Sequence, residues 1–271
     1  IEQGLIYGIL ALGVYITYKI LDFPDLTVDG SFPLGAAVTA ALLTKGISPF
    51  LTLAASFLAG ALAGVCTGFI HVKGKVRDLL SGIIMMTALW SINLYIAGTS
   101  NVPLFSQKTI FRNDRVSEYF PDAVKPYSTL AVICKILLDL YLKTKSGYLL
   151  RAAGDNDALV TALAKDQGNV KILGLALANG LTALAGCIFA QEERVFEISM
   201  GTGAIVIGLA SVIIGTSIFR KLTVVKTTTA VLAGSVIYKA CVAVALKNFE
   251  PNAMKLITAV LFLVILILSM E

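Results

Sequence analysis

The sequence predicts an all-α membrane protein: a polytopic helix bundle that forms a single domain over residues 1–271. The first observation is composition, because hydrophobic residues make up 57% of the chain, charged residues only 14%, and the mean hydropathy is +0.84. A soluble domain is roughly 45–50% apolar and about 25% charged. The other two observations are a series of apolar runs and the placement of Lys and Arg between them. Together they exclude a soluble globular domain, a disordered chain and a coiled coil.

Nine charge-poor apolar runs follow one another along the chain. A membrane helix needs roughly 20 mostly apolar residues, so these runs account for most of the sequence. The expected spans are residues 3–18, 30–44, 46–70, 79–100, 126–142, 172–191, 198–219, 227–246 and 256–270. Because the run 30–44 is short, the sequence allows eight or nine transmembrane helices. In the third run, Gly60, Gly64 and Gly68 form a strip of small residues that lets another helix approach closely.

The connections between the runs predict the orientation. Cytoplasmic loops carry an excess of Lys and Arg, and the basic residues gather in the connections 71–78, 143–171 and 220–226. Placing these inside makes 101–125 an outside loop. Nine spans then put the N-terminus outside and the C-terminus inside. If the run 30–44 does not cross, eight spans move the N-terminus inside.

The inner connection 143–171 is long in a chain of short loops. Its run from residue 158 to 165 consists of good helix formers, and Leu159 and Leu163 share one face. We therefore expect a short amphipathic helix on the cytoplasmic surface, which Gly168 ends. The segment of about 144–169 is the candidate for coupling to a partner.

Enzymatic sites are not visible in the sequence. The single histidine, His71, lies at the edge of a predicted span, and neither an H-E-x-x-H motif nor a G-x-x-x-x-G-K-[ST] phosphate loop is present. The four cysteines lie in apolar runs and are expected to be small buried side chains rather than disulfides or metal ligands. We expect no enzyme, no metal and no cofactor in this chain, and any use of ATP requires a separate ATPase.

Three ionisable residues lie inside predicted spans, where charges are costly and often functional. Lys135 and Asp139 are four residues apart, which favours a neutralising pair on one helix face. Lys239 either extends to the membrane interface or lines a pathway. Asp139 is the candidate for a proton-coupled carrier.

The segment between the first two runs is acidic and rich in helix-breaking residues. Asp22, Asp25 and Asp29 occur with Pro24 and Pro33 between two apolar runs. This pattern fits either a solvated turn or a broken helix that acts as a hinge or gate, since irregular backbone inside a membrane must face protein or water. A similar order of helix, acidic segment and Gly-rich short helix recurs at 172–219. The two copies start on opposite sides, so they are either an inverted repeat or a chance similarity.

Three blocks of sequence carry a family resemblance: KILDFPDLTVDGSFPLGAA at 19–37, LRAAGDN at 150–156 and MGTGAIVIGLASVIIG at 200–215. They resemble the bacterial ABC-importer permeases of the branched-chain amino acid and ribose type. Within that family the chain is most similar to the small amino-acid-type subgroup that works with a lipoprotein binding protein. Many members carry an additional N-terminal span.

The resemblance implies a permease subunit of an importer in the bacterial cytoplasmic (inner) membrane. It implies a homodimer that works with two cytoplasmic ATPases, which bind ATP and Mg, and with an extracytoplasmic substrate-binding lipoprotein. The transported solute is then expected to be small. The subgroup favours an amino acid, and most narrowly an aromatic one. The block at 150–156 corresponds to the loop that docks on the ATPase. The residues expected to couple to the ATPase are Arg151, Gly154, Asp155, Asn156 and Leu159.

The pathway or gate is expected in the two broken-helix regions, 22–31 and 199–208, where polar groups meet small residues. Its candidate residues are Asp22, Asp25, Thr27, Asp29, Ser31, Met200 and Thr202. The alternative is an ion-coupled secondary carrier or a channel, which predicts uptake by this chain alone without ATP. An intramembrane enzyme is disfavoured because the histidine and ligand constellations are missing.

Overall fold

The computed structural model describes residues 2–111, 126–155, 167–220 and 226–248, with short helical pieces between 258 and 267. Six helical segments in this part of the chain are long and apolar enough to cross a membrane. They are α1 (Glu2–Tyr15) continued by the π-helix η1 (Ile16–Ile20), α3 (Pro49–Val72), α4 (Asp78–Ala97), α9 (Gln167–Glu193), the 3-10 helix η2 (Ile198–Gly201) with α10 (Ala204–Ile218), and α11 (Thr227–Asn248). The structure therefore confirms a multi-pass helix bundle.

Three further helices are shorter. They are α2 (Val28–Thr44), α6 (Pro126–Tyr141) and α7 (Lys145–Asp155). The sequence explains several helix ends: Pro49 occupies the first turn of α3, where a missing N–H is tolerated, and Gly98 ends α4 with a positive φ of 79°. The predicted surface helix at 158–165 lies outside the described residues, and α7, which precedes it, was not predicted.

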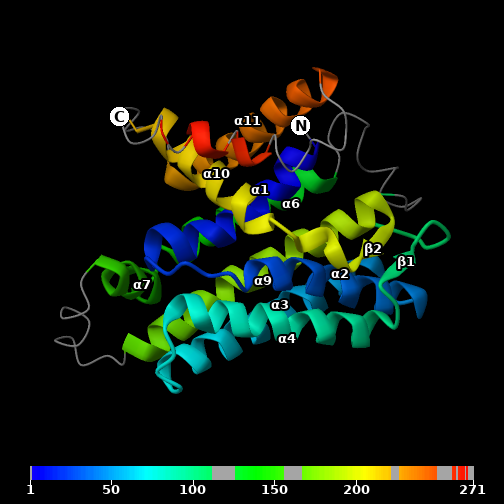
Figure 1. Ribbon diagram of the computed structural model, residues 1–271, viewed down its shortest axis with the longest axis horizontal. Helices are drawn as coiled ribbons and strands as arrows, with labels where there is room; N and C mark the ends of the chain where they lie inside the picture. Colours follow the sequence, from blue (N-terminus) through cyan, green and yellow to red (C-terminus); the bar gives the residue numbers. More distant parts are fainter. Residues whose placement is uncertain are drawn as a thin grey trace.

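Helix α9 lies in the middle of the bundle and packs along α1, α2 and α3 (Figure 1). The contact with α3 runs along the predicted strip of small residues. A Cβ atom on Gly60 would overlap the backbone oxygen of Asn179, and one on Gly64 would overlap that of Leu175. The close approach expected from the glycine spacing is therefore confirmed. Helix α11 packs against α10 and α1 on the other side of α9.

The chain also contains a small antiparallel sheet that the all-α prediction missed. Strand β1 (Asn101–Pro103) pairs with β2 (Val195–Glu197), with Asn101 opposite Glu197. Strands this short have no periodicity of their own, so their sequence carries no signal. The sheet joins the connection after α4 to the end of α9.

Two units of the chain have the same order of elements and run in opposite directions. In the first, α1 and η1 are followed by the irregular segment 21–27 and then by α2. In the second, α9 is followed by β2 and η2 and then by α10. Gln3 donates a hydrogen bond to Glu193 at 2.9 Å, which places the start of α1 beside the end of α9. This is the inverted arrangement that the sequence echo suggested.

The two ends of the bundle differ in their elements. One end, here the α7 end, contains the ends of η1 and α3, helix α7 and the start of α9; the other, the sheet end, contains β1, β2 and the start of α3 (Figure 1). The side chains of Phe23 and His71 meet at the α7 end, with ring centroids 5.1 Å apart. The described basic residues of the three predicted inner connections lie between helices, in α7 or in the first turns of α9 on this side: Lys73, Lys75, Arg77, Lys143, Lys145, Arg151, Lys171, Arg220 and Lys226.

Candidate functional site

The first turns of α2 and α10 meet in the middle of the bundle. The carboxylate of Asp29, in the first turn of α2, accepts hydrogen bonds from the backbone N–H groups of Gly203 at 3.0 Å and Ile205 at 2.8 Å. These donors belong to the start of α10, where N–H groups have no partner within the helix. A negative charge is stabilising at that end of a helix dipole. Asp29 thus caps a helix of the other unit.

Proline and glycine allow this junction to form. In a regular helix the N–H of residue 33 would donate to the carbonyl of residue 29. Pro33 has no N–H, so the carbonyl of Asp29 lacks this partner. Gly201 of η2 packs against that carbonyl and against the Pro33 ring, and a Cβ atom at position 201 would overlap the carbonyl oxygen. The two broken helices therefore approach at backbone contact.

A buried polar network lies beside the junction. Asn179 of α9 donates to a carboxylate oxygen of Asp25 at 2.7 Å and accepts from the hydroxyl of Ser31 at 2.7 Å. The other carboxylate oxygen of Asp25 accepts from the backbone N–H of Thr27 at 2.9 Å. The Thr27 hydroxyl lies 2.9 Å from that of Thr67 in α3. All five residues are buried, so the irregular segment before α2 is tied to α9 and α3.

We expect Asn179→Leu to destabilise the protein by about 1–3 kcal/mol, because it leaves a buried carboxylate oxygen and a buried hydroxyl without their partner. The measurement is thermal unfolding of the purified protein in mild detergent. In the double variant D25L/N179L both partners are gone, so its destabilisation should be clearly smaller than the sum of the two single effects. Additive effects would show that the pair does not interact.

A cavity of about 310 Å³ opens at the junction, between α2, α4 and η2. Its walls contain Asp29 and Thr202, one from each predicted broken-helix region. The other residues that line it are Gly30, Pro33, Met86, Thr87, Trp90, Asn93 and Ile198. The folded chain therefore brings together two predicted pathway residues that are distant in the sequence.

The remaining predicted pathway residues occupy different places. Asp25, Thr27 and Ser31 belong to the buried network and do not line the cavity. Asp22 is exposed with a positive φ of 50°, a conformation that Asp tolerates better than most residues. Met200 is partly buried and packs against apolar side chains.

Three site residues were missed by the sequence reasoning. Asn179, Asn93 and Trp90 all lie inside predicted apolar runs. Each is a single amide or indole in a long apolar segment. That feature could have indicated them, because polar groups in a membrane span tend to be functional. The candidates predicted inside the spans were all ionisable: Lys135, Asp139 and Lys239.

The charges inside the spans have partners. Lys135 and Asp139 form the predicted pair at 2.9 Å. Asp139 also lies 3.2 Å from Lys226 and accepts from the Thr228 hydroxyl at 2.6 Å. The Lys239 ammonium lies over the Tyr7 ring, 3.8 Å from its centroid, a cation–π contact.

The predicted coupling residues that the structure describes, Arg151, Gly154 and Asp155, lie in α7. In α7, Gly154 packs against the carbonyl of Ile20 in η1, and a Cβ atom at 154 would overlap that oxygen. Leu150 is fully buried and contacts Gly174 in α9. Arg151 is exposed. Asp155 is the last residue of α7, while Asn156 and Leu159 lie outside the described residues. Helix α7 thus contacts η1 of the first unit and α9 of the second.

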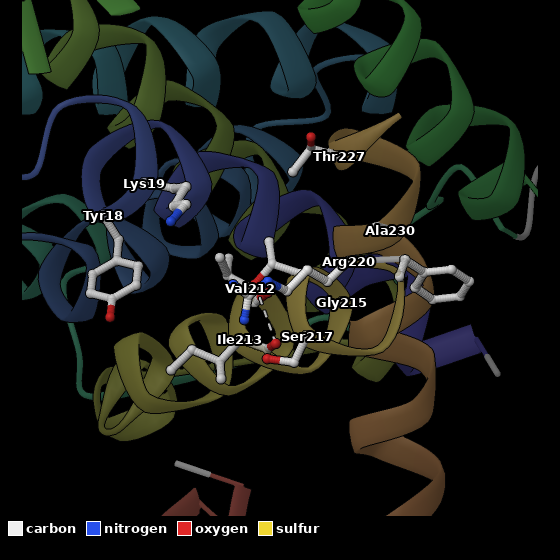
Figure 2. Close-up of a pocket in the computed structure, with 11 residues that line it drawn as sticks. Tyr18, Lys19, Val212, Ile213, Gly215, Ser217, Arg220, Thr227 and Ala230 are labelled. Carbon is white, nitrogen blue, oxygen red and sulfur yellow. Dashed lines mark hydrogen bonds between the residues drawn. The ribbon is translucent and has the colours of Figure 1, made fainter. Parts of the chain in front are cut away.

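A second cavity at this end is polar and basic. It has a volume of about 530 Å³ and lies between η1, the end of α10 and the start of α11. Figure 2 shows Lys19 on η1, and Ser217 and Arg220 at the end of α10, around this cavity. A basic opening agrees with the excess of Lys and Arg at the α7 end.

The cysteine prediction was only half right. Cys134 and Cys187 are buried, whereas Cys66 and Cys241 are exposed on the outside of the bundle, and all four are free thiols. An apolar run does not distinguish the lipid-facing side of a helix from its buried side, since both are apolar. Among the described residues, no group of three or more His, Cys, Asp or Glu side chains is arranged to hold a metal ion.

A multi-pass bundle in which two oppositely oriented units meet through broken helices is an architecture that many membrane transport proteins share. Comparison with known families agrees: the model of the family "Branched-chain amino acid transport system / permease component" matches residues 1–269. The chain belongs to this family, the ABC-importer permease type that its sequence resembles. It is a transport permease and not an enzyme, as expected.

Several curated relatives are similar over most of the chain. The tyrosine transport system permease protein of Clostridioides difficile (strain R20291) is 46% identical over 265 residues, 97% of this chain and 88% of the relative. The probable branched-chain amino acid transport permease protein LivH of Methanocaldococcus jannaschii is 29% identical over 225 residues, 76% of this chain and 70% of the relative. The ribose import permease protein RbsC of Escherichia coli (strain K12) is 25% identical over 223 residues, which cover 79% of this chain and 67% of the relative. No solved structure matches the chain significantly.

Proposed function

We propose that this chain is the membrane-spanning subunit of an ATP-binding cassette importer that forms the pathway for an amino acid. The observation that carries the proposal is the junction of α2 and α10 at Asp29, in a chain whose family transports small solutes. Alternating access requires two parts that move against each other around a central site. The two inverted units provide such parts, and the Asp29 cap is a contact that motion between them would break and remake.

The proposed subunit depends on partners. Because the sequence has no phosphate-binding loop, ATP and Mg bind to separate ABC ATPases at the α7 end. Helix α7 contacts η1 of the first unit and α9 of the second, so a partner bound there moves both units. A second copy of the chain and an extracytoplasmic substrate-binding lipoprotein complete the complex. The similarity to a tyrosine permease favours an aromatic amino acid as solute.

The proposed topology has nine crossings, with the α7 end in the cytoplasm of a bacterium. Helix α1 runs to the α7 end, and the segment 21–27 with α2 returns to the sheet end. In the second unit, α9 runs from the α7 end to the sheet end, and η2 with α10 returns to the α7 end. This places the N-terminus outside and the C-terminus inside, in the cytoplasmic membrane, and it follows the distribution of Lys and Arg.

The test is to purify the tagged chain from native membranes in mild detergent, identify the proteins that accompany it, and measure ATP hydrolysis. We expect an ABC ATPase in equal amount and a binding lipoprotein. Proteoliposomes of the recovered complex should take up tyrosine only with ATP. Recovery of the chain alone, together with uptake that follows an ion gradient and needs no ATP, would overturn the proposal in favour of a secondary carrier. Asp139 and Lys239 would then be the first residues to test.

The coupling role of α7 makes a separate prediction. Arg151→Glu reverses an exposed charge on α7, so we expect at least about a tenfold loss of ATPase binding, equivalent to about 1.4 kcal/mol. Lys73→Glu reverses an exposed charge at the same end but outside α7, and it should retain most binding. Co-purification of the ATPase with each variant is the measurement. Equal losses in both variants would mean that only the overall charge of this end matters.

A further inference from the structure

We propose that the cavity between α2, α4 and η2 is where the pathway contacts its solute, and that it takes a neutral amino acid with an aromatic side chain. In this arrangement the aromatic ring lies on Trp90, and a donor group of the solute binds the side-chain oxygen of Asn93. The inference rests on the proposed function and assigns its solute site to named residues.

The apolar part of the cavity suits a ring. Trp90 is the single tryptophan of the chain; it lines the cavity and is 47% exposed overall. Met86 on the same helix, Pro33 of α2 and Ile198 of η2 form the other apolar walls. Aromatic rings gain from contact with an indole and with a thioether beyond the area that they bury. The volume of about 310 Å³ is at the small end of the range for ligand pockets, which fits one small solute.

Asn93 supplies an acceptor that the protein itself does not use. Its side-chain nitrogen donates to the backbone oxygen of Gly30 at 3.1 Å, which fixes the amide. Its side-chain oxygen is buried and has no hydrogen-bond partner. Leaving such an atom unpaired costs free energy, and a solute hydroxyl or ammonium group would supply the missing donor. The oxygen is covered in this conformation, so solute entry must separate the walls above it.

The charge of the lining narrows the class of solute. Asp29 is the one ionisable side chain among the described residues that line the cavity, and its oxygens bind α10. A negative lining disfavours an anionic solute. The other side-chain polar groups are the Asn93 amide, the Trp90 indole N–H and the hydroxyls of Thr87 and Thr202. The Thr87 hydroxyl already donates to Ile83. A sugar with several hydroxyls would find few partners here, whereas an aromatic amino acid needs few.

The position of the cavity connects binding to motion. Asn93 holds the backbone of Gly30, and the neighbouring Asp29 holds the start of α10. A solute bound to Asn93 therefore touches the residues that join the two units. Ligands shift an equilibrium between conformations when they contact the two conformations differently, and this site is placed to do so.

The single tryptophan makes the test direct. The purified chain in micelles of a mild detergent is excited at a wavelength that tryptophan absorbs and tyrosine does not, and Trp90 emission is followed while L-phenylalanine, L-leucine, L-glutamate or D-ribose is added. We expect a saturable change with phenylalanine, at least about tenfold weaker binding of leucine, and no response to glutamate or ribose. Equal responses to phenylalanine and leucine would overturn the aromatic assignment.

Variants identify the residues responsible. Asn93→Leu removes the acceptor and should weaken phenylalanine binding at least about tenfold, whereas Asn93→Asp keeps an acceptor and should bind more tightly than the leucine variant. Tyr95→Leu changes a residue of α4 that is 91% exposed and does not line the cavity, and it should bind like the unaltered chain. Thermal unfolding of each variant identifies loss of folding. Unchanged affinity in a folded Asn93→Leu protein would overturn the site.

The titration needs no ATPase, so it separates the two proposals. ATP-driven uptake of phenylalanine by the complex, with Trp90 emission insensitive to the solute, would overturn the site and leave the importer intact. A saturable emission change without a recoverable ATPase would support the site and overturn the importer.

Discussion

Gly35→Val is expected to prevent folding of the bundle, with a destabilisation of at least about 3 kcal/mol. Gly35 lies on α2 where this helix crosses α9, and a Cβ atom there would overlap the backbone oxygen, carbonyl carbon and Cα of Ala183. Backbone atoms of a central helix cannot move aside as the end of a flexible side chain can. The added methyl groups would push α2 away from α9 and open the junction at its start.

The control is Ala41→Val, which adds the same kind of bulk on α2 at a position that is only partly buried. We expect this variant to stay within about 0.5 kcal/mol of the unaltered chain. The measurement is the yield of monodisperse protein in size-exclusion chromatography and its midpoint of thermal unfolding. Similar behaviour of the two variants would contradict the close crossing of α2 and α9.

Asp29→Ala is expected to reduce ATP-driven uptake at least about tenfold, while the protein still folds. The carboxylate accepts two backbone hydrogen bonds from α10, and loss of a helix cap costs about 0.5–2 kcal/mol. That cost is small for a whole bundle but large for an equilibrium between two conformations, because 1.4 kcal/mol changes a population ratio about tenfold. We therefore expect the turnover number to fall and the unfolding midpoint to change little.

Asp29→Asn and Asp22→Asn form a matched pair. The amide introduced by Asp29→Asn has one oxygen, so it satisfies one of the two N–H groups and places an NH₂ group near the other; uptake should be intermediate. Asp22 is exposed at the start of the irregular segment that precedes α2, and asparagine tolerates its positive φ. Asp22→Asn removes the same charge and should transport normally. Equal losses in both variants would show that net charge, and not the cap on α10, is what transport requires.

The sequence by itself determined the class of this protein. The excess of apolar residues cannot be kept in water, whatever the arrangement of the helices, and each apolar run indicates its helix without reference to any other. The structure begins α3 at Pro49 and ends α4 before Gly98 because proline and glycine act on the backbone next to them. The glycine strip of α3 also predicted a close helix contact. These features depend on composition, on local chemistry or on a repeat of a few residues.

The partners of the polar groups could not be predicted in the same way. Asp29 lies 174 residues before Gly203, and Asn179 lies 154 residues after Asp25. A carboxylate in an irregular segment has the same local sequence whether it faces water or caps a distant helix, so the sequence left both possibilities open. The pairing of β1 with β2 is a third case, because three-residue strands exist only through their partner.

The tertiary structure alone decided which polar residues share a site. It combined Asp29 and Thr202 from the two predicted broken-helix regions with Trp90 and Asn93 of α4, and it placed Asp25 in a separate buried network. Helix packing decides this outcome, because the glycine contacts fix the distances between helices and the helix rotation fixes which side chains face each other. The local sequence determines that helices form and insert in a membrane, whereas the packing of distant segments determines where a solute can bind.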